Sequence, residues 1–144
     1  GQMERLEDQM TLRSKNAEVL NSLMRDIEGI VLPEDDPRMT RHAYHLYIFK
    51  LSPELAAKVD KKTFCRMLNA EGIPVQEGYH SLNLNQVLQK EIYKCTGKQD
   101  VQSCPNAERA AAHEAMWLAQ NVLLGDESDV HDIATAVRKV VQAI

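Results

Sequence analysis

A long amphipathic segment at the start of the chain is the feature that most restricts its fold. Apolar residues recur there at three- and four-residue intervals, which predicts one face of a helix; they are Met3, Leu6, Met10, Ala17, Leu20, Met24 and Ile27. Arg13 is expected to interrupt this stripe, and Gly29 supplies a stop signal. A helix of about 25 residues is ~37 Å long at 1.5 Å per residue. We therefore expect its first turns, with Met3, Leu6 and Met10, to pack on another domain or chain.

The next part of the chain alternates strand and helix signals. Residues 42–51 are rich in aromatic and aliphatic side chains and predict a strand. Asp60 is expected to cap a helix that ends at Gly72. Residues 73–75 predict a short strand at an edge of the sheet, because Pro74 cannot donate to a strand ladder.

The C-terminal part carries two more helix signals. Residues 78–103 are weakly patterned and are predicted to be mostly loop. A helix is expected from Pro105 to Ala115, followed by short extended pieces at Trp117, Leu118, Val122 and Leu123. Asp126 or Ser128 caps the last helix, whose buried stripe is predicted to be Val130, Ile133, Val137, Val140 and Ile144.

This order of elements predicts an α/β (α+β) fold. We expect a small, mostly antiparallel sheet with helices packed on one face, preceded by a long linker helix. The length of 144 residues fits one domain. Residues 1–29 would be the linker helix and residues 30–144 the domain proper.

Composition and spacing argue against several classes of function. The net charge is −4, so no basic excess predicts nucleic-acid binding. No apolar run approaches the ~18 residues of a membrane span. The charged N-terminal residues do not look like a secretion signal, which predicts a cytoplasmic protein. The isolated glycines exclude a phosphate loop of the Gly-x-x-x-x-Gly-Lys type.

Cysteine and histidine positions predict no metal site. Cys65, Cys95 and Cys104 are an odd number of thiols, which we expect to be reduced. No Cys-x-x-Cys pair is present, and His113-Glu114 lacks the second histidine of a zinc-protease helix because Trp117 stands there.

Four stretches carry a family resemblance. They are QMERLEDQMTLRSKNAEVLNSLM (residues 2–24), HAYHLYIFKL (42–51), GIPVQEGYHSLNLN (72–85) and CPNAERAAAHEAMWLAQNVLLGDESDVHDIATAVRKV (104–140). In this order and spacing they resemble the C-terminal part of the DegT/DnrJ/EryC1/StrS family, the sugar aminotransferases that use pyridoxal phosphate. The resemblance covers nearly the whole chain.

The resemblance implies the small C-terminal domain of a fold-type I pyridoxal phosphate transferase. Such enzymes move an amino group from glutamate or glutamine to a keto sugar or keto-polyol. Their cofactor is held by a large domain of the same polypeptide, and this chain lacks the family's serine-rich lysine motif and its Gly-Glu-Gly-Gly stretch. We therefore expect no catalytic or cofactor-binding residue in this chain, an inactive isolated domain, and a homodimeric parent enzyme.

The resemblance also implies a substrate-facing segment at Tyr79, His80 and Asn83. In the family, the residues after the Gly-Ile strand help to bound the substrate pocket. His80 stands where the family often has proline, and Asn83 near where histidine or tyrosine is common, so the acceptor is expected to differ. The alternatives are a surface loop without substrate contact and, for the whole chain, a stand-alone interaction or ligand-binding module.

Overall fold

A four-stranded antiparallel sheet lies at the centre of the molecule. The computed structural model describes residues 1–34, 36–98 and 102–144. The strands are β1 (Ile30–Val31), β2 (Leu46–Leu51), β3 (Val75–Gln76) and β4 (Ala115–Ala119), in the order β1-β2-β4-β3. β2 and β4 pair from Leu46 opposite Ala119 to Lys50 opposite Ala115. The fold class predicted from the sequence is confirmed, and β3 is an edge strand as expected.

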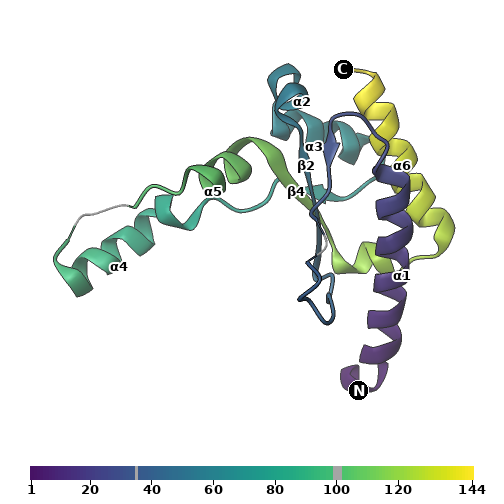
Figure 1. Ribbon diagram of the computed structural model, residues 1–144, viewed down its shortest axis with the longest axis horizontal. Coiled ribbons are helices and arrows are strands. Elements are labelled where there is room, and N and C mark those ends of the chain that lie inside the picture. The colour runs from purple at the N-terminus through teal and green to yellow at the C-terminus, as the bar shows by residue number, and fades with distance from the viewer. Residues whose placement is uncertain (35, 99–101) are drawn as a thin grey trace.

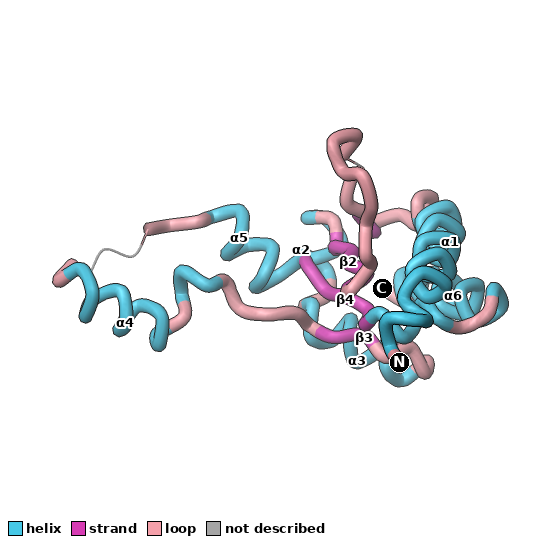
Figure 2. The backbone as a smooth tube through the Cα atoms, turned by 90° about the horizontal axis from the view of Figure 1, so that it is seen from below, coloured by secondary structure: helices cyan, strands magenta, loops and turns pink. Residues whose placement is uncertain are grey.

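One face of the sheet is covered by helices. Successive side chains of a strand point to opposite faces, and Tyr47, Phe49 and Leu51 of β2 are buried while Ile48 is 40% exposed. The buried face packs in one core with α1 (Leu6–Met24), α3 (Lys61–Ala70) and α6 (Glu127–Gln142). Figures 1 and 2 show α1 and α6 side by side, with the N-terminus at the far end of α1.

The helix caps follow the sequence signals. Ser52 accepts a hydrogen bond from the Leu55 backbone at the start of α2 (Pro53–Lys58), and Asp60 accepts one from Thr63 at the start of α3. Asp126 caps α6 in a reciprocal capping box with Asp129, which decides between Asp126 and Ser128. These side chains satisfy backbone N–H groups that a helix leaves unpaired at its start.

A projecting arm departs from the sequence prediction. Residues 78–103 were expected to be mostly loop, but they contain a 3-10 turn (η2, Leu82–Leu84) and an eleven-residue helix, α4 (Gln86–Thr96). α5 (Pro105–Arg109) leads back and continues as a π-helix (η3, Ala110–Glu114) into β4. We call residues 81–98 and 102–109 the arm and the rest of the described chain the body. Figures 1 and 2 show the arm extending away from α1 and α6.

Three further expectations need correction. The predicted strand at 42–51 begins only at Leu46. Val122 and Leu123 lie in a 3-10 helix (η4, Gln120–Leu124), not in an extended piece. Ile144 lies beyond α6 and is 36% exposed, whereas the other four residues of its predicted stripe are buried. Each of these residues lies at an end of the chain or in an irregular segment, where side chains do not follow the regular spacing of a strand or helix.

The polar residues of α1 also behave differently from expectation. Arg13 does not interrupt the buried face, because it is itself only 5% exposed and donates to Gln120 Oε1 at 2.6 Å. Asn16 is 1% exposed and donates to the carbonyls of Leu123 and Gly125. Two polar side chains thus fix η4 against α1, since a buried polar group is stable only when it is hydrogen-bonded. Of the three residues expected to pack on another domain or chain, Met3 is 80% and Leu6 37% exposed, whereas Met10 is half-buried and accepts from Arg13.

No helix in the described ranges is both long and apolar enough to cross a lipid bilayer.

Candidate functional site

The predicted segment begins on the uncovered face of the sheet. Gly78 has a φ of +87°, and a Cβ atom there would come within 2.9 Å of the Trp117 ring. Glycine therefore lets the chain pass directly over Trp117. The Tyr79 ring packs on Trp117 in a tilted arrangement, with centroids 4.7 Å apart and an interplanar angle of 54°, and Tyr79 is itself 75% exposed. Trp117 is buried, and its indole N–H donates to Gln76 Oε1 at 3.0 Å.

His80 and Asn83 have different surroundings. The His80 side chain is exposed and makes no hydrogen bond or ion pair with the described residues. Asn83, in contrast, uses its side-chain amide within the arm. Its Nδ2 donates to the Gln102 carbonyl at 3.0 Å and to Glu108 Oε1 at 2.6 Å, and its Oδ1 accepts from Ser81. Asn83 therefore joins the outgoing and returning segments of the arm.

Glu108 completes this joint. Its carboxylate accepts from the Cys104 backbone N–H at 2.7 Å as well as from Asn83. These two hydrogen bonds, the Cys104 one foremost, hold the pKa of Glu108 below its usual value. A charged acceptor strengthens both bonds. This hydrogen-bonded joint begins at Ser81, directly after His80 in the chain.

A charged cluster marks the place where the arm returns to the sheet. Glu114, at the end of the π-helix, is 6% exposed and accepts from Arg109 Nε at 2.7 Å. Lys50 Nζ on β2 lies 4.0 Å from the second Glu114 oxygen. On the other side of the π-helix, the Lys61 ammonium donates to the Ala111 carbonyl. The π-helix is therefore tied to both β2 and α3.

Sequence analysis missed this cluster. Arg109 and Glu114 are five residues apart, a spacing that does not align on an α-helix but does on a π-helix with its i→i+5 pattern. The spacing becomes informative only once the π-helix is known. Within the described ranges, no group of three or more histidine, cysteine, aspartate or glutamate side chains could hold a metal ion.

The comparison with protein families matches this chain to the DegT/DnrJ/EryC1/StrS aminotransferase family over residues 1–138. The chain belongs to this family. The arm, the four-stranded sheet and the two long helices are therefore features of an aminotransferase-family segment.

Two curated relatives illustrate the match. The chain is 30% identical to L-glutamine:2-deoxy-scyllo-inosose aminotransferase of Streptoalloteichus tenebrarius, covering 98% of this chain and 35% of that protein. It is 24% identical to 3-amino-5-hydroxybenzoate synthase of Amycolatopsis mediterranei, covering 97% of this chain and 36% of the relative. The chain thus spans about a third of the length of these relatives.

Solved structures share the fold. A crystal structure of 3-amino-5-hydroxybenzoic acid synthase superposes with a TM-score of 0.78 at 20% identity, over 99% of this chain and 37% of that one. An aminotransferase of Psychrobacter cryohalolentis gives a TM-score of 0.75 at 20% identity, over 99% and 37% of the two chains. At this identity the likeness establishes the fold alone.

The family's cofactor, pyridoxal phosphate, does not fit the described residues by themselves. It needs a lysine amine free to react with its aldehyde, and donors for its phosphate. Lys61 is buried, but its ammonium is bonded to the Ala111 carbonyl. Lys58 does line one of the two cavities beside β1, but Glu28 and Glu54 line the same cavity, and their carboxylates would repel the cofactor's phosphate. No chemical step is therefore assigned to the cofactor on this chain.

Proposed function

We propose that this chain is the C-terminal small domain of a pyridoxal phosphate-dependent aminotransferase that moves an amino group from glutamate or glutamine to a keto sugar or keto-polyol. The family match over residues 1–138 carries this proposal. The names of the relatives, which pair L-glutamine with a keto-inosose, support the substrate class. Residues 1–29 would link the two domains, and residues 30–144 would form the small domain.

The division of labour follows from which residues this chain contains. A large domain of the same polypeptide would hold pyridoxal phosphate, which withdraws electrons from the carbon that exchanges its amino group. The small domain would bound the acceptor pocket and exclude water from it. The parent enzyme would be a homodimer in the cytoplasm.

We assign acceptor contact to the segment Tyr79–Asn83. Tyr79 offers an exposed aromatic face with a polar tip, and His80 offers ring nitrogens without a protein partner among the described residues. Asn83 would act by holding the segment in place, because its amide is bonded to Gln102 and Glu108. Substitution of Tyr79 or His80 should therefore remove a contact to the acceptor, whereas substitution of Asn83 should loosen the segment.

Kinetics of the full-length enzyme test this assignment. His80→Ala should lower kcat/KM for the keto acceptor roughly 2- to 12-fold, the effect of losing one hydrogen bond of about 0.5–1.5 kcal/mol. Asn83→Ala should lower it as well and also loosen the arm in hydrogen exchange. Both variants should keep the absorbance spectrum of the bound cofactor. Asn106→Ala, an exposed arm residue, is the control. Full activity of both variants would contradict the assignment.

A second experiment tests the inactivity of the isolated domain. The 144-residue chain, incubated with pyridoxal phosphate and then borohydride, should show no stoichiometric label on a single lysine. The physical reason is that the buried Lys61 amine is bonded to a carbonyl, while Lys58 shares its cavity with Glu28 and Glu54, whose carboxylates repel a phosphate. One specifically and fully labelled lysine, located by peptide mass mapping, would contradict the expectation.

A further inference from the structure

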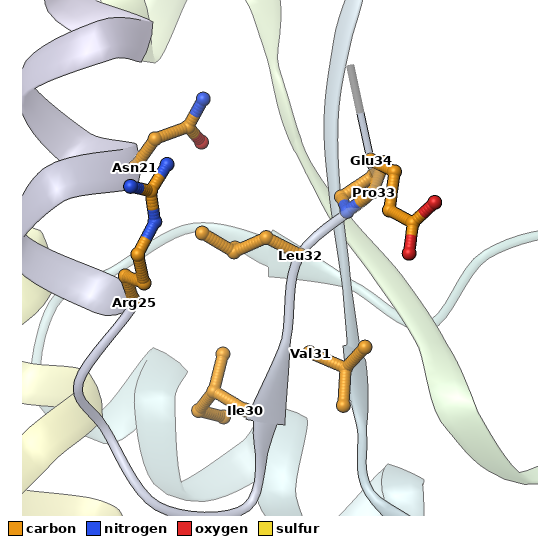
Figure 3. Close-up of a pocket in the computed structure, with 7 residues that line it drawn as sticks. All are labelled: Asn21, Arg25, Ile30, Val31, Leu32, Pro33 and Glu34. Carbon is orange, nitrogen blue, oxygen red and sulfur yellow. The ribbon is translucent and has the colours of Figure 1, made fainter. Parts of the chain in front are cut away.

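A cavity of about 390 Å³ lies beside β1, on a part of the body that the proposed function does not use. Its lining residues are Asn21, Arg25, Ile30, Val31, Leu32, Pro33 and Glu34. Figure 3 shows Asn21 and Arg25 on the α1 side and the other residues on the strand and the segment that follows it. None of these residues belongs to the arm or to Tyr79–Asn83.

A hydrogen bond from Tyr47 on β2 fixes the orientation of the Asn21 side-chain amide. The Tyr47 hydroxyl lies 2.7 Å from Asn21 Oδ1. Burial raises the pKa of the Tyr47 phenol, so the hydroxyl keeps its proton and donates it to Oδ1. Asn21 Nδ2 is then the free end of the amide, and it makes no hydrogen bond with the described residues. Asn21 thus contributes a hydrogen-bond donor to the cavity.

Arg25 contributes donors to the same wall. It follows Asn21 by four residues on the helix, so the two side chains are neighbours. The guanidinium has five N–H donors and no acceptor, and it forms no hydrogen bond or ion pair within the described residues. The Asn21 oxygen already accepts from Tyr47. The groups on this wall that remain without a partner among the described residues are therefore donors, Asn21 Nδ2 and the positively charged Arg25 guanidinium.

The other walls are different. Ile30 is 8% exposed and forms part of the core, and Leu32 packs against that core while its side chain is directed toward α1 in Figure 3. The carboxylate of Glu34 stands at the far side of the cavity. An apolar wall favours an aliphatic group, and a carboxylate on the far side disfavours a second negative charge on a ligand.

We propose that this cavity binds a small monocarboxylate, with its carboxylate on Arg25 and Asn21 Nδ2 and its short aliphatic body against Leu32. Guanidinium and amide N–H groups match carboxylate oxygens in both charge and geometry. This binding is independent of amino transfer, because the cavity shares no residue with the proposed acceptor site.

The test uses the 144-residue chain and two matched probes, 4-methylpentanoate and its uncharged amide. Nitrogen–proton NMR titration should show saturable shifts at residues 21, 25, 30–32 and 34 with a Kd on the order of 1 mM for the carboxylate, as is usual for so small a ligand. The amide should bind at least 10-fold more weakly. Arg25→Gln should lower the affinity for the carboxylate about 10-fold, and Arg5→Gln, at the N-cap of α1 and outside the cavity lining, should leave it unchanged.

The spectrum of each variant also reports whether it is folded, which separates lost binding from lost structure. A second variant, Asn21→Leu, keeps Arg25 and should lower carboxylate affinity by a smaller factor than Arg25→Gln. Equal affinity for acid and amide, an unchanged Kd in a folded Arg25→Gln chain, or shifts confined to other residues would each overturn the proposal. None of these outcomes bears on the aminotransferase assignment.

Discussion

Helices α6 and α4 are both amphipathic in sequence, yet the structure treats them in opposite ways. α6 buries Val130, Ile133, Ala134, Ala136, Val137 and Val140. α4 buries none of its eleven residues, and Val87 is 67% exposed. α6 is therefore held by the core, because burial of an apolar stripe stabilises most protein helices. α4 must be held by something else.

The arm that carries α4 is joined by polar contacts. The half-buried residues of the arm are Asn83, Gln89 and Glu108, and all three take part in one hydrogen-bond network. Asn85 caps the start of α4, and Gly97, with a φ of +67°, ends it. Polar joints fix direction at a small net gain in stability. Burial of apolar side chains in the body therefore provides most of the stability of the chain, whereas the hydrogen bonds of the arm mainly set its direction.

The largest difference between body and arm is expected when the same substitution, leucine to alanine, is made once in each. Leu68→Ala in α3, where the side chain is fully buried, should lower the free energy of unfolding by about 2–5 kcal/mol. Leu88→Ala in α4, where the side chain is 41% exposed, should change it by about 0.5 kcal/mol or less. Urea denaturation followed by circular dichroism measures both. Similar losses would mean that the arm belongs to the cooperative core.

A smaller effect is expected when a buried polar joint of the body is removed. Asn16→Ala leaves the buried Leu123 carbonyl without its hydrogen bond, which should cost about 2–3 kcal/mol. Asn106→Ala in the arm serves as the control, because that side chain is exposed. An Asn16→Ala chain with the urea midpoint of the unmodified chain would show that η4 is not fixed through this residue.

Removing one helix cap in each region tests whether the loss of stability is global or confined to the arm. Ser52→Ala in the body and Asn85→Ala in the arm each remove a cap worth about 1 kcal/mol. The first should lower global stability. The second should leave it unchanged and speed hydrogen exchange of α4 amides about 5-fold, since α4 can open alone. An equal loss of the free energy of global unfolding in both variants would refute local opening of the arm.

The smallest effect concerns alkaline pH. Burial raises the pKa of the Cys65 thiol in the body from 9.0 to about 11. Between these pH values the unfolded chain loses this proton before the folded chain does, so stability should fall as pH rises. Cys65→Ala should flatten that slope, whereas Cys95→Ala, at an exposed arm thiol, should not. Stability measured at several pH values decides this, and an unaltered slope in Cys65→Ala would contradict it.

The fold was largely predictable because the body follows its hydrophobic periodicity. The stripes of α1 and α6, the caps at Asp60 and Asp126, and the edge position of β3 are local signals that burial reinforces. α4 was missed although its sequence is amphipathic. Its start and stop signals, Asn85 and Gly97, were nonetheless present in the sequence and could have identified it.

The site was less predictable, because its residues act through partners distant in sequence. Asn83 was predicted as a polar residue facing substrate, but its bond to Glu108 spans 25 residues. Arg13 was predicted to break a stripe, yet it is buried through Gln120, which lies 107 residues away. Sequence spacing cannot anticipate such pairs. The assignment of Tyr79, His80 and Asn83 to the acceptor pocket stays a prediction.

The π-helix at Ala110–Glu114 has a consequence for how this fold can change over evolution. A π-turn is an α-helical segment with one residue too many. Losing that residue would rotate everything beyond it by about 100° around the helix axis while moving it only ~1.5 Å along the axis. The arm could then be redirected by a one-residue insertion or deletion that leaves the core sequence of the body intact.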